Sequence, residues 1–154
     1  MIVRLAQQQD FASFLGLAAQ VEHWFGPMVN DPGFHQAVEN HIHRSAALVA
    51  VSAELEVLGG LMFGTKAPVY QIHWLVVSQQ QRGAGIGKAL MADVTRRFTQ
   101  TPGSIEAITF GADHPGAIVS GARAFYEGLG FTAAEAAAPG LEGGPRQVYR
   151  RPIP

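Results

Sequence analysis

The stretch QRGAGIGKAL, residues 81–90, places three glycines within five positions and then turns apolar. It follows VYQIHWLVV (69–77), which is rich in the β-branched and aromatic residues that favour a strand. Beyond the glycines, apolar residues recur every four positions, as on a helix with one buried face: Ile86, Leu90, Val94 and Phe98. We therefore expect a strand, a glycine turn and a helix start, where free N–H groups and the helix dipole favour an anion.

A nucleoside-triphosphate loop is one interpretation of this stretch. Such a loop needs a glycine, four residues, and then Gly-Lys followed by Ser or Thr. Gly87 and Lys88 supply the central pair, but Arg82 stands at the outer glycine and Ala89 at the magnesium-binding hydroxyl. The pattern therefore fits only in its middle.

A dinucleotide-binding turn is a second interpretation. After Gly83 and Gly85 it needs a third glycine at the position that Lys88 occupies. Glu106 follows at a suitable distance for a ribose contact, but it falls at the start of its strand rather than at the end. A third possibility is a structural turn that binds nothing.

The composition bounds what the chain can be. Its 154 residues suffice for one domain, and the net charge of −1 gives no basic excess for nucleic acid or membrane surfaces. Without cysteine, there are no disulfides, thiolate metal sites or cysteine nucleophiles. The first residues, MIVRLAQQQD, lack the apolar core of a signal peptide, and no later run approaches a membrane span. We expect a soluble, cytoplasmic protein without nucleic-acid or membrane partners.

Hydrophobic patterning predicts one domain over residues 1–154, of α+β or α/β class with a mixed sheet, in the order β-α-α-β-β-β-α-β-α-β-β. Residues 132–145 read as a loose connection. The expected strands cover residues 2–6, 46–51, 58–64, 69–77, 104–110, a short segment near 131, and 146–150. The expected helices cover residues 10–25, 34–44, 86–98 and 116–128.

Two segments resemble motifs of GNAT-family N-acetyltransferases. LVVSQQQRGAGIGKAL (75–90) is similar to the acetyl-coenzyme A loop, whose pattern Arg/Gln-x-x-Gly-x-Gly/Ala is filled by Arg82, Gly85 and Gly87. ARAFYEGLGF (122–131) is similar to a later helix of the family that reads Phe-Tyr and then Gly-Phe. The element order also matches over nearly the whole chain. The resemblance implies the GNAT fold and acetyl-coenzyme A (acetyl-CoA) as co-substrate, with no metal.

The resemblance also implies a cofactor site, in which backbone N–H groups of residues 83–88 hold the pyrophosphate. Many family members carry an asparagine where Val119 stands, and Ser120 beside it is the expected substitute. The expected cofactor-binding residues are Leu75, Val76, Val77, Arg82, Gly83, Ala84, Gly85, Ile86, Gly87, Lys88, Ser120 and Tyr126.

The same resemblance implies direct attack of an amine on the thioester in a ternary complex. Tyr126 is the expected acid beside the sulfur, and a backbone N–H within residues 75–77 is the expected oxyanion donor. Some members place a glutamate base where Gln71 stands, whereas aralkylamine acetyltransferases have a histidine where His73 stands. His73 is therefore the expected base or proton relay. Asp113 and His114 are further candidates at the mouth of the site.

The resemblance also implies an acceptor site formed by the first two helices and their connection. Trp24, Phe25 and Met28 are candidate lining residues together with Phe34, and Gln71 and His73 complete the expected substrate site. Glu22, Asp31 and Glu39 are candidates to attract an ammonium group. We expect a small, partly apolar primary amine.

Several alternatives stay open at this point. A protein N-terminus is a second possible acceptor, and a coenzyme A-binding sensor without turnover is the alternative to an enzyme. His35, His41 and His43 form no tetrahedral ligand set, so no metal is expected. A homodimer is possible.

Overall fold

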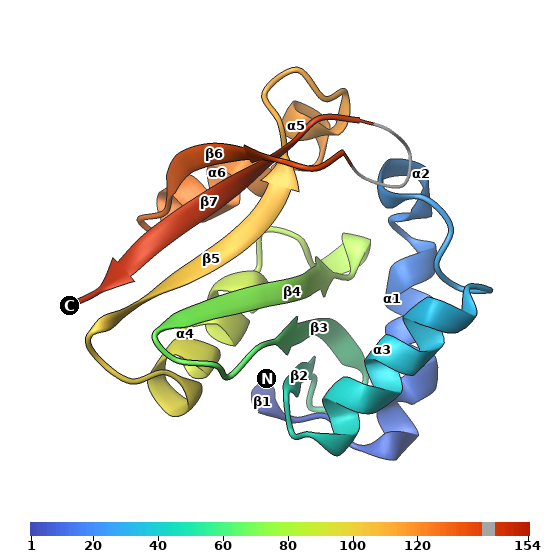
Figure 1. The fold of residues 1–154 in the computed structure, drawn as a ribbon. Helices are drawn as coiled ribbons and strands as arrows, with labels where there is room; N and C mark the ends of the chain where they lie inside the picture. The colour runs from blue at the N-terminus through green and yellow to red at the C-terminus, as the bar shows by residue number, and fades with distance from the viewer. Residues whose placement is uncertain (140–143) are drawn as a thin grey trace.

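A seven-stranded mixed sheet organises the computed structural model, which describes residues 1–139 and 144–154 (Figure 1). The strand order is β1-β2-β3-β4-β5-β7-β6, and β4 and β5 are the parallel pair among otherwise antiparallel neighbours. The strands are β1 (Ile2–Leu5), β2 (Ala47–Val51), β3 (Val57–Phe63), β4 (Val69–Val77), β5 (Gly103–Phe110), β6 (Thr132–Ala137) and β7 (Arg146–Ile153). The expected α+β class is confirmed.

Helices cover both faces of the sheet. On one face, α1 (Phe11–Ala19) and α3 (Pro32–His43) lie side by side and bury Phe14 and Val38 against the sheet (Figure 1). On the other face, α4 (Ile86–Phe98) and α6 (Ala122–Gly128) bury Leu90 and Tyr126. The short elements are η1 (Gln8–Asp10), α2 (Glu22–Phe25), η2 (Gln79–Gln81) and α5 (Gly116–Val119). No helix in the described part of the chain is long and apolar enough to cross a membrane.

The expected element order is confirmed, with three local differences. The helix expected over 10–25 ends at Ala19 and resumes as α2. The helix expected over 116–128 divides into α5 and α6, because Gly121 adopts φ +70°. The connection expected over 132–145 begins as strand β6, which pairs with β7, and residues 140–143 lie outside the described part.

Two glycines of β3 bring helices close to both faces of the sheet. A Cβ built on Gly60 would lie 2.9 Å from Cε1 of Phe14 in α1. A Cβ on Gly59 would lie 3.1 Å from Ile86 and 3.3 Å from Leu90 in α4. Glycine has a low propensity for strands, but here it is required because α1 packs closely on one face of β3 and α4 on the other.

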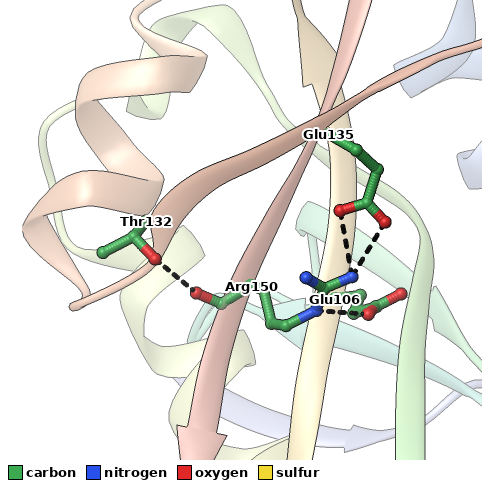
Figure 2. Close-up of polar contacts among 4 residues, drawn as sticks. All are labelled: Glu106, Thr132, Glu135 and Arg150. Carbon is green, nitrogen blue, oxygen red and sulfur yellow. Dashed lines mark hydrogen bonds and ion pairs between the residues drawn. The ribbon is translucent and has the colours of Figure 1, made fainter.

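The half of the sheet formed by β5, β7 and β6 carries an ion-pair cluster on the face opposite α6 (Figure 2). Arg150 of β7 donates from Nε to Glu106 of β5 at 2.6 Å and from Nη2 to Glu135 of β6 at 3.0 and 3.2 Å. The preceding residue, Tyr149, is fully buried toward α6, so alternation along the strand turns Arg150 to the other face. The cluster is partly exposed, so we expect it to add little to the free energy of unfolding. Its main effect is on how β5, β7 and β6 pair with one another.

Gly60→Ala should lower the free energy of unfolding by about 1–3 kcal/mol, because the new methyl group overpacks the buried Phe14 ring. Gly16→Ala is the matched control: Gly16 is exposed in α1 and a Cβ there meets nothing within 4 Å. This control should leave stability unchanged or raise it by up to about 1 kcal/mol through helix propensity. Urea unfolding measures both, and equal effects of the two substitutions would contradict the packing argument.

Candidate active site

The sheet opens between β4 and β5. Their pairing runs from Val69 with Ser104 to Ile72 with Ala107, and within the described residues it continues no further. Both strands go on, β4 to Val77 and β5 to Phe110, and they diverge toward their carboxyl ends (Figure 1). The backbone N–H and C=O groups of β4 that face this opening therefore make no hydrogen bonds to β5.

Alternation along β4 identifies which N–H groups face the opening. Ser78 donates to the carbonyl of Leu58, so its N–H points toward β3. Successive residues of a strand point their N–H groups in opposite directions, so Val76 also turns toward β3. The N–H groups of Leu75 and Val77 then point into the opening, where they are available to a carbonyl oxygen.

The start of α4 adds a second set of free N–H groups. The first helical hydrogen bond runs from Ala89 to the Gly85 carbonyl at 3.0 Å. It leaves Ile86, Gly87 and Lys88 without intrahelical partners, and the dipole of this 13-residue helix favours an anion there. The N–H of Ala84 differs, because it donates to the Gln81 carbonyl at 3.2 Å.

The three glycines of the loop have different structural reasons. Gly83 and Gly85 both adopt φ +82°, the left-handed region that residues with a side chain disfavour, and a Cβ on either would meet nothing within 4 Å. Gly87 is required by packing, since a Cβ there would lie 2.9 Å from Cε1 of Phe125. Only Gly83 and Gly85 therefore leave open space beside the helix start.

One cavity of about 450 Å³ joins the strand opening to the start of α4. It gathers every predicted cofactor residue except Ala84, and it also takes in Trp24 and Phe25 from the predicted acceptor region. The lining residues are Val21, Trp24, Phe25, Leu75, Val76, Val77, Gln81, Arg82, Gly83, Gly85, Ile86, Gly87, Lys88, Phe110, Ser120, Gly121, Ala122, Phe125 and Tyr126.

Aromatic side chains form one wall of this cavity. Phe25 stacks on Phe110 with centroids 4.8 Å apart, and Trp24 meets Phe110 edge-on at 6.5 Å. The Arg82 guanidinium lies 5.2 Å from the Trp24 ring, a cation–π contact that links the loop to this wall. Sequence reasoning missed Phe110, although it is the last residue of the strand that diverges from β4.

Tyr126 is held by the capping motif at the end of α6. Gly130 adopts φ +89°, and its N–H donates to the Glu127 carbonyl at 3.0 Å. The N–H of Phe131 donates to the Tyr126 carbonyl at 3.0 Å, and the two rings pack edge to face at 5.3 Å. These bonds make a Schellman motif with its hydrophobic contact, so the segment YEGLGF is a helix-ending motif that also orients the tyrosine.

The Tyr126 side chain is buried, yet it borders the cavity. Its hydroxyl makes no hydrogen bond to any residue that the structure describes. Among these residues, no fully buried side-chain oxygen lacks a hydrogen-bond partner, so the Tyr126 hydroxyl is not sealed off and is open to the cavity. Burial raises the pKa of Tyr126 above its usual value. The cavity therefore contains a neutral phenol whose hydrogen is free to be donated.

Ser120 lies where α5 ends, at the same cavity. Its hydroxyl accepts a hydrogen bond from the N–H of Ala122 at 3.2 Å, which helps to start α6. The neighbouring Val119 is exposed. The residue expected to replace the family's asparagine is thus beside the cavity, while Val119 is directed to solvent.

Three of the predicted acceptor residues are engaged in the fold itself. Met28 is buried and lies outside the cavity lining. The Glu22 carboxylate accepts from the N–H groups of Met28 and Val29 at 2.7 and 2.9 Å, and these bonds hold its pKa below the usual range. Asp31 caps α3 by accepting from Gly33 and Phe34 at 3.3 Å.

Gln71 and His73 lie apart from the residues that line this cavity. They border a second cavity of about 300 Å³, beside the end of α3 and the connection from β3 to β4. His73 is the extra residue of a bulge, since Phe63 pairs with Ile72 while Met62 pairs with Trp74. Burial, together with the nearby His41 and Arg44, lowers the pKa of His73.

The remaining candidates, Asp113 and His114, lie outside the lining of the first cavity. His114 is buried, accepts from the Gly116 N–H at Nδ1 at 2.8 Å, and packs on Phe110 at 4.4 Å. Asp113 is exposed. Among residues 1–139 and 144–154, no three His, Asp or Glu side chains gather in a way that could hold a metal ion.

Free N–H groups beside an opened strand pair, a helix start and a buried phenol form a combination that suits acyl transfer. A family model described as the acetyltransferase (GNAT) domain matches residues 17–140. The chain belongs to this family, and it is a GNAT-type acetyltransferase. The comparison with curated protein sequences gives no match.

Solved structures with the same fold are distant in sequence. A ribosomal-protein-alanine N-acetyltransferase from Brucella melitensis has TM-score 0.74 and 19% identity, over 99% of this chain and 100% of that one. An aminoglycoside 6'-N-acetyltransferase in complex with coenzyme A has TM-score 0.72 and 18% identity, over 100% and 98%. A phosphinothricin acetyltransferase from Sinorhizobium meliloti in complex with acetyl-CoA has TM-score 0.70 and 20% identity, over 99% and 88%.

Gly130→Ala should lower the free energy of unfolding by about 1–2 kcal/mol, because φ +89° forces the new Cβ against the backbone and weakens the cap behind Tyr126. Gly130→Asn is the matched control and should cost less, since asparagine adopts the left-handed region more readily. Urea unfolding compares the two. An alanine variant as stable as the wild type would show that the capping motif does not constrain this turn.

Proposed function

We propose that this protein transfers the acetyl group of acetyl-CoA to the primary amine of a small molecule, by direct attack in a ternary complex. The observation that carries the proposal is the cavity that joins the β4–β5 opening to the start of α4. It brings the free N–H groups of β4, the start of α4 and a buried phenol into one continuous space.

The residues of this cavity fit the chemistry of acetyl-CoA. The N–H groups of Ile86, Gly87 and Lys88 are suited to a pyrophosphate, and the open space at Gly83 and Gly85 admits it close to the backbone. The apolar wall along β4 suits the pantetheine arm. Structures of two relatives with this fold hold coenzyme A or acetyl-CoA, which supports the same ligand here.

The reaction follows from these positions. The amine nitrogen forms a bond to the acetyl carbon, and the carbonyl oxygen gains negative charge that the N–H groups of Leu75 and Val77 stabilise. The carbon–sulfur bond then breaks, the electron pair leaves with the sulfur, and the nitrogen gives up one proton. No covalent acyl-enzyme is required, which agrees with a chain that lacks cysteine.

Tyr126 assists the leaving sulfur. A phenol with a raised pKa is a weaker acid than a thiol of ordinary pKa near 8.5, so complete proton transfer to the thiolate is uphill. We therefore assign Tyr126 the role of a hydrogen-bond donor that stabilises the developing thiolate.

His73 receives the proton of the amine in this proposal. A strand rises about 3.3 Å per residue, which places the Cα atoms of His73 and Leu75 about 7 Å apart along β4. Because His73 borders the second cavity and not this one, water must carry the proton from the amine to the imidazole. The lowered pKa keeps His73 neutral and able to accept a proton near pH 7.

The acceptor is proposed from the aromatic wall. Trp24, Phe25 and Phe110 present apolar ring surfaces. Glu22 and Asp31 are already bonded to backbone N–H groups, so they offer less to a polyamine. A small aromatic or aliphatic amine suits this wall, and we take 2-phenylethylamine as the first probe, with spermidine, kanamycin and an alanine-terminated peptide for comparison.

Gly85→Asp should weaken acetyl-CoA binding at least tenfold relative to Gly85→Asn. Both side chains tolerate φ +82°, and they differ in one negative charge beside the proposed pyrophosphate site. Isothermal titration calorimetry with acetyl-CoA, ATP and NAD measures the difference. Equal affinities in the two variants would remove the loop from the proposed site. Tighter binding of ATP or NAD than of acetyl-CoA would overturn the proposed ligand.

Tyr126→Phe should keep acetyl-CoA affinity within about threefold and lower kcat by about 10²–10³-fold, the range found when one preorganised donor to developing negative charge is removed. The rate is followed as thiol release with 2-phenylethylamine and the three comparison acceptors. A variant with wild-type kcat would refute the role of the hydroxyl. If the wild type binds acetyl-CoA and acetylates none of the four acceptors, a non-catalytic sensor becomes the better description.

A further inference from the structure

His41 and His73 form a hydrogen-bonded pair that links α3 to β4. Nε2 of His41 lies 2.8 Å from Nδ1 of His73, and the rings meet edge to face with centroids 5.0 Å apart. Nδ1 of His41 lies 2.6 Å from the carbonyl oxygen of Ala37, one turn earlier in α3. His41 is 7% exposed, so water does not substitute readily for these partners.

The hydrogen bonds determine where the protons of the pair lie. A carbonyl oxygen only accepts, so Nδ1 of His41 must carry the hydrogen that bonds to Ala37. In a neutral ring the other nitrogen, Nε2, is then an acceptor. Nδ1 of His73 must therefore donate to it, which leaves the lone pair of His73 on Nε2.

The edge of His73 that carries this lone pair faces the second cavity. A Cβ built on Gly64 would lie 3.3 Å from both Nε2 and Cε1 of His73, so the glycine keeps this edge open. The cations at the same cavity are Arg44, at the end of α3, and Lys66, in the connection to β4. Gln71 faces it from β4 itself.

We infer that His41 is a positioning residue, which holds His73 in the Nδ1–H form so that its Nε2 accepts the proton of the acceptor amine. The inference rests on the base role proposed above for His73. For this step, water must lead from the amine nitrogen to the second cavity, where Nε2 of His73 takes the proton while Nδ1–H keeps its bond to His41. The imidazolium then releases the same proton to solvent at the second cavity, and the pair returns to its starting form.

The electrostatic surroundings agree with this arrangement. Burial lowers the pKa of His41 and of His73, and Arg44 contributes to both shifts. The pair is therefore neutral near pH 7, and the tautomers assigned above are the forms present. In a free imidazole the hydrogen occupies either ring nitrogen. The preference for Nδ1 at His73 therefore depends on its hydrogen bond to His41.

The direct test is ¹⁵N NMR of histidine side chains, which distinguishes a protonated ring nitrogen from a bare one. In the wild type at pH 7.5, we expect His73 with hydrogen on Nδ1 and a bare Nε2. His41→Leu should shift His73 toward the opposite tautomer. His41→Gln offers an amide oxygen near the position of Nε2 and should restore the Nδ1–H form in part. His43→Gln, an exposed substitution in the same helix, is the control and should change nothing.

Kinetics with 2-phenylethylamine then separates positioning from structure. His41→Leu should lower kcat at least tenfold with little change in the KM for acetyl-CoA, and His41→Gln should recover much of the loss. Urea unfolding of each variant shows whether it is folded under assay conditions. Loss of kcat that His41→Gln does not restore, in a folded protein, would overturn the positioning role.

The two proposals fail in different ways. If His73 in the wild type carries its hydrogen on Nε2, the inference about His41 is wrong, whatever the activity. If the tautomer is as assigned but His73→Ala keeps full kcat, the base role of His73 is wrong, and the positioning role falls with it. Neither outcome bears on acetyl-CoA binding, which calorimetry measures separately.

Discussion

The end of the β4–β5 ladder at Ile72 and Ala107 is the constraint on which the site depends. A parallel pair inside a sheet normally satisfies its backbone along its whole length. Here β4 continues to bond β3 as far as Val77, so it stays in place while its other edge is released. The opening gives Leu75 and Val77 free N–H groups, and the helix that follows β4 begins at the same end.

Glycine accounts for how closely the helices approach this opening. Gly59 and Gly60 reduce the thickness of β3, so that α4 and α1 rest almost on its backbone. Gly87 likewise lets α4 and α6 approach each other, because the Phe125 ring occupies the space that a side chain at residue 87 would need. The start of α4 is thereby packed closely against the sheet and against α6, the helix that carries Tyr126.

Much of this arrangement could be predicted from local patterns. The strand, the loop and the start of α4 follow from alternation, glycine spacing and the four-residue repeat, because each depends on neighbours in sequence. Tyr126 follows from a local motif, which proves to be a helix cap. Met28 and Glu22 could not be assigned in this way, since only the folded connection after α2 shows that one is core and the other bonds the backbone. The bulge at His73 and its partner His41, 32 residues away, also have no local signature.

The position of β7 between β5 and β6 bears on the order in which the site is assembled. β7 follows every other strand in the chain, yet it enters the sheet between two that precede it. Its Tyr149 packs on Tyr126, with ring centroids 6.3 Å apart, and bonds Glu127 at 2.7 Å. During synthesis, β1 to β5 and α4 can pair before β7 emerges, whereas β6 has no sheet neighbour until then. The contacts that hold Tyr126 against Tyr149 can therefore form only after β7 has been made, whereas the packing of α4 on β2 and β3 does not require β7.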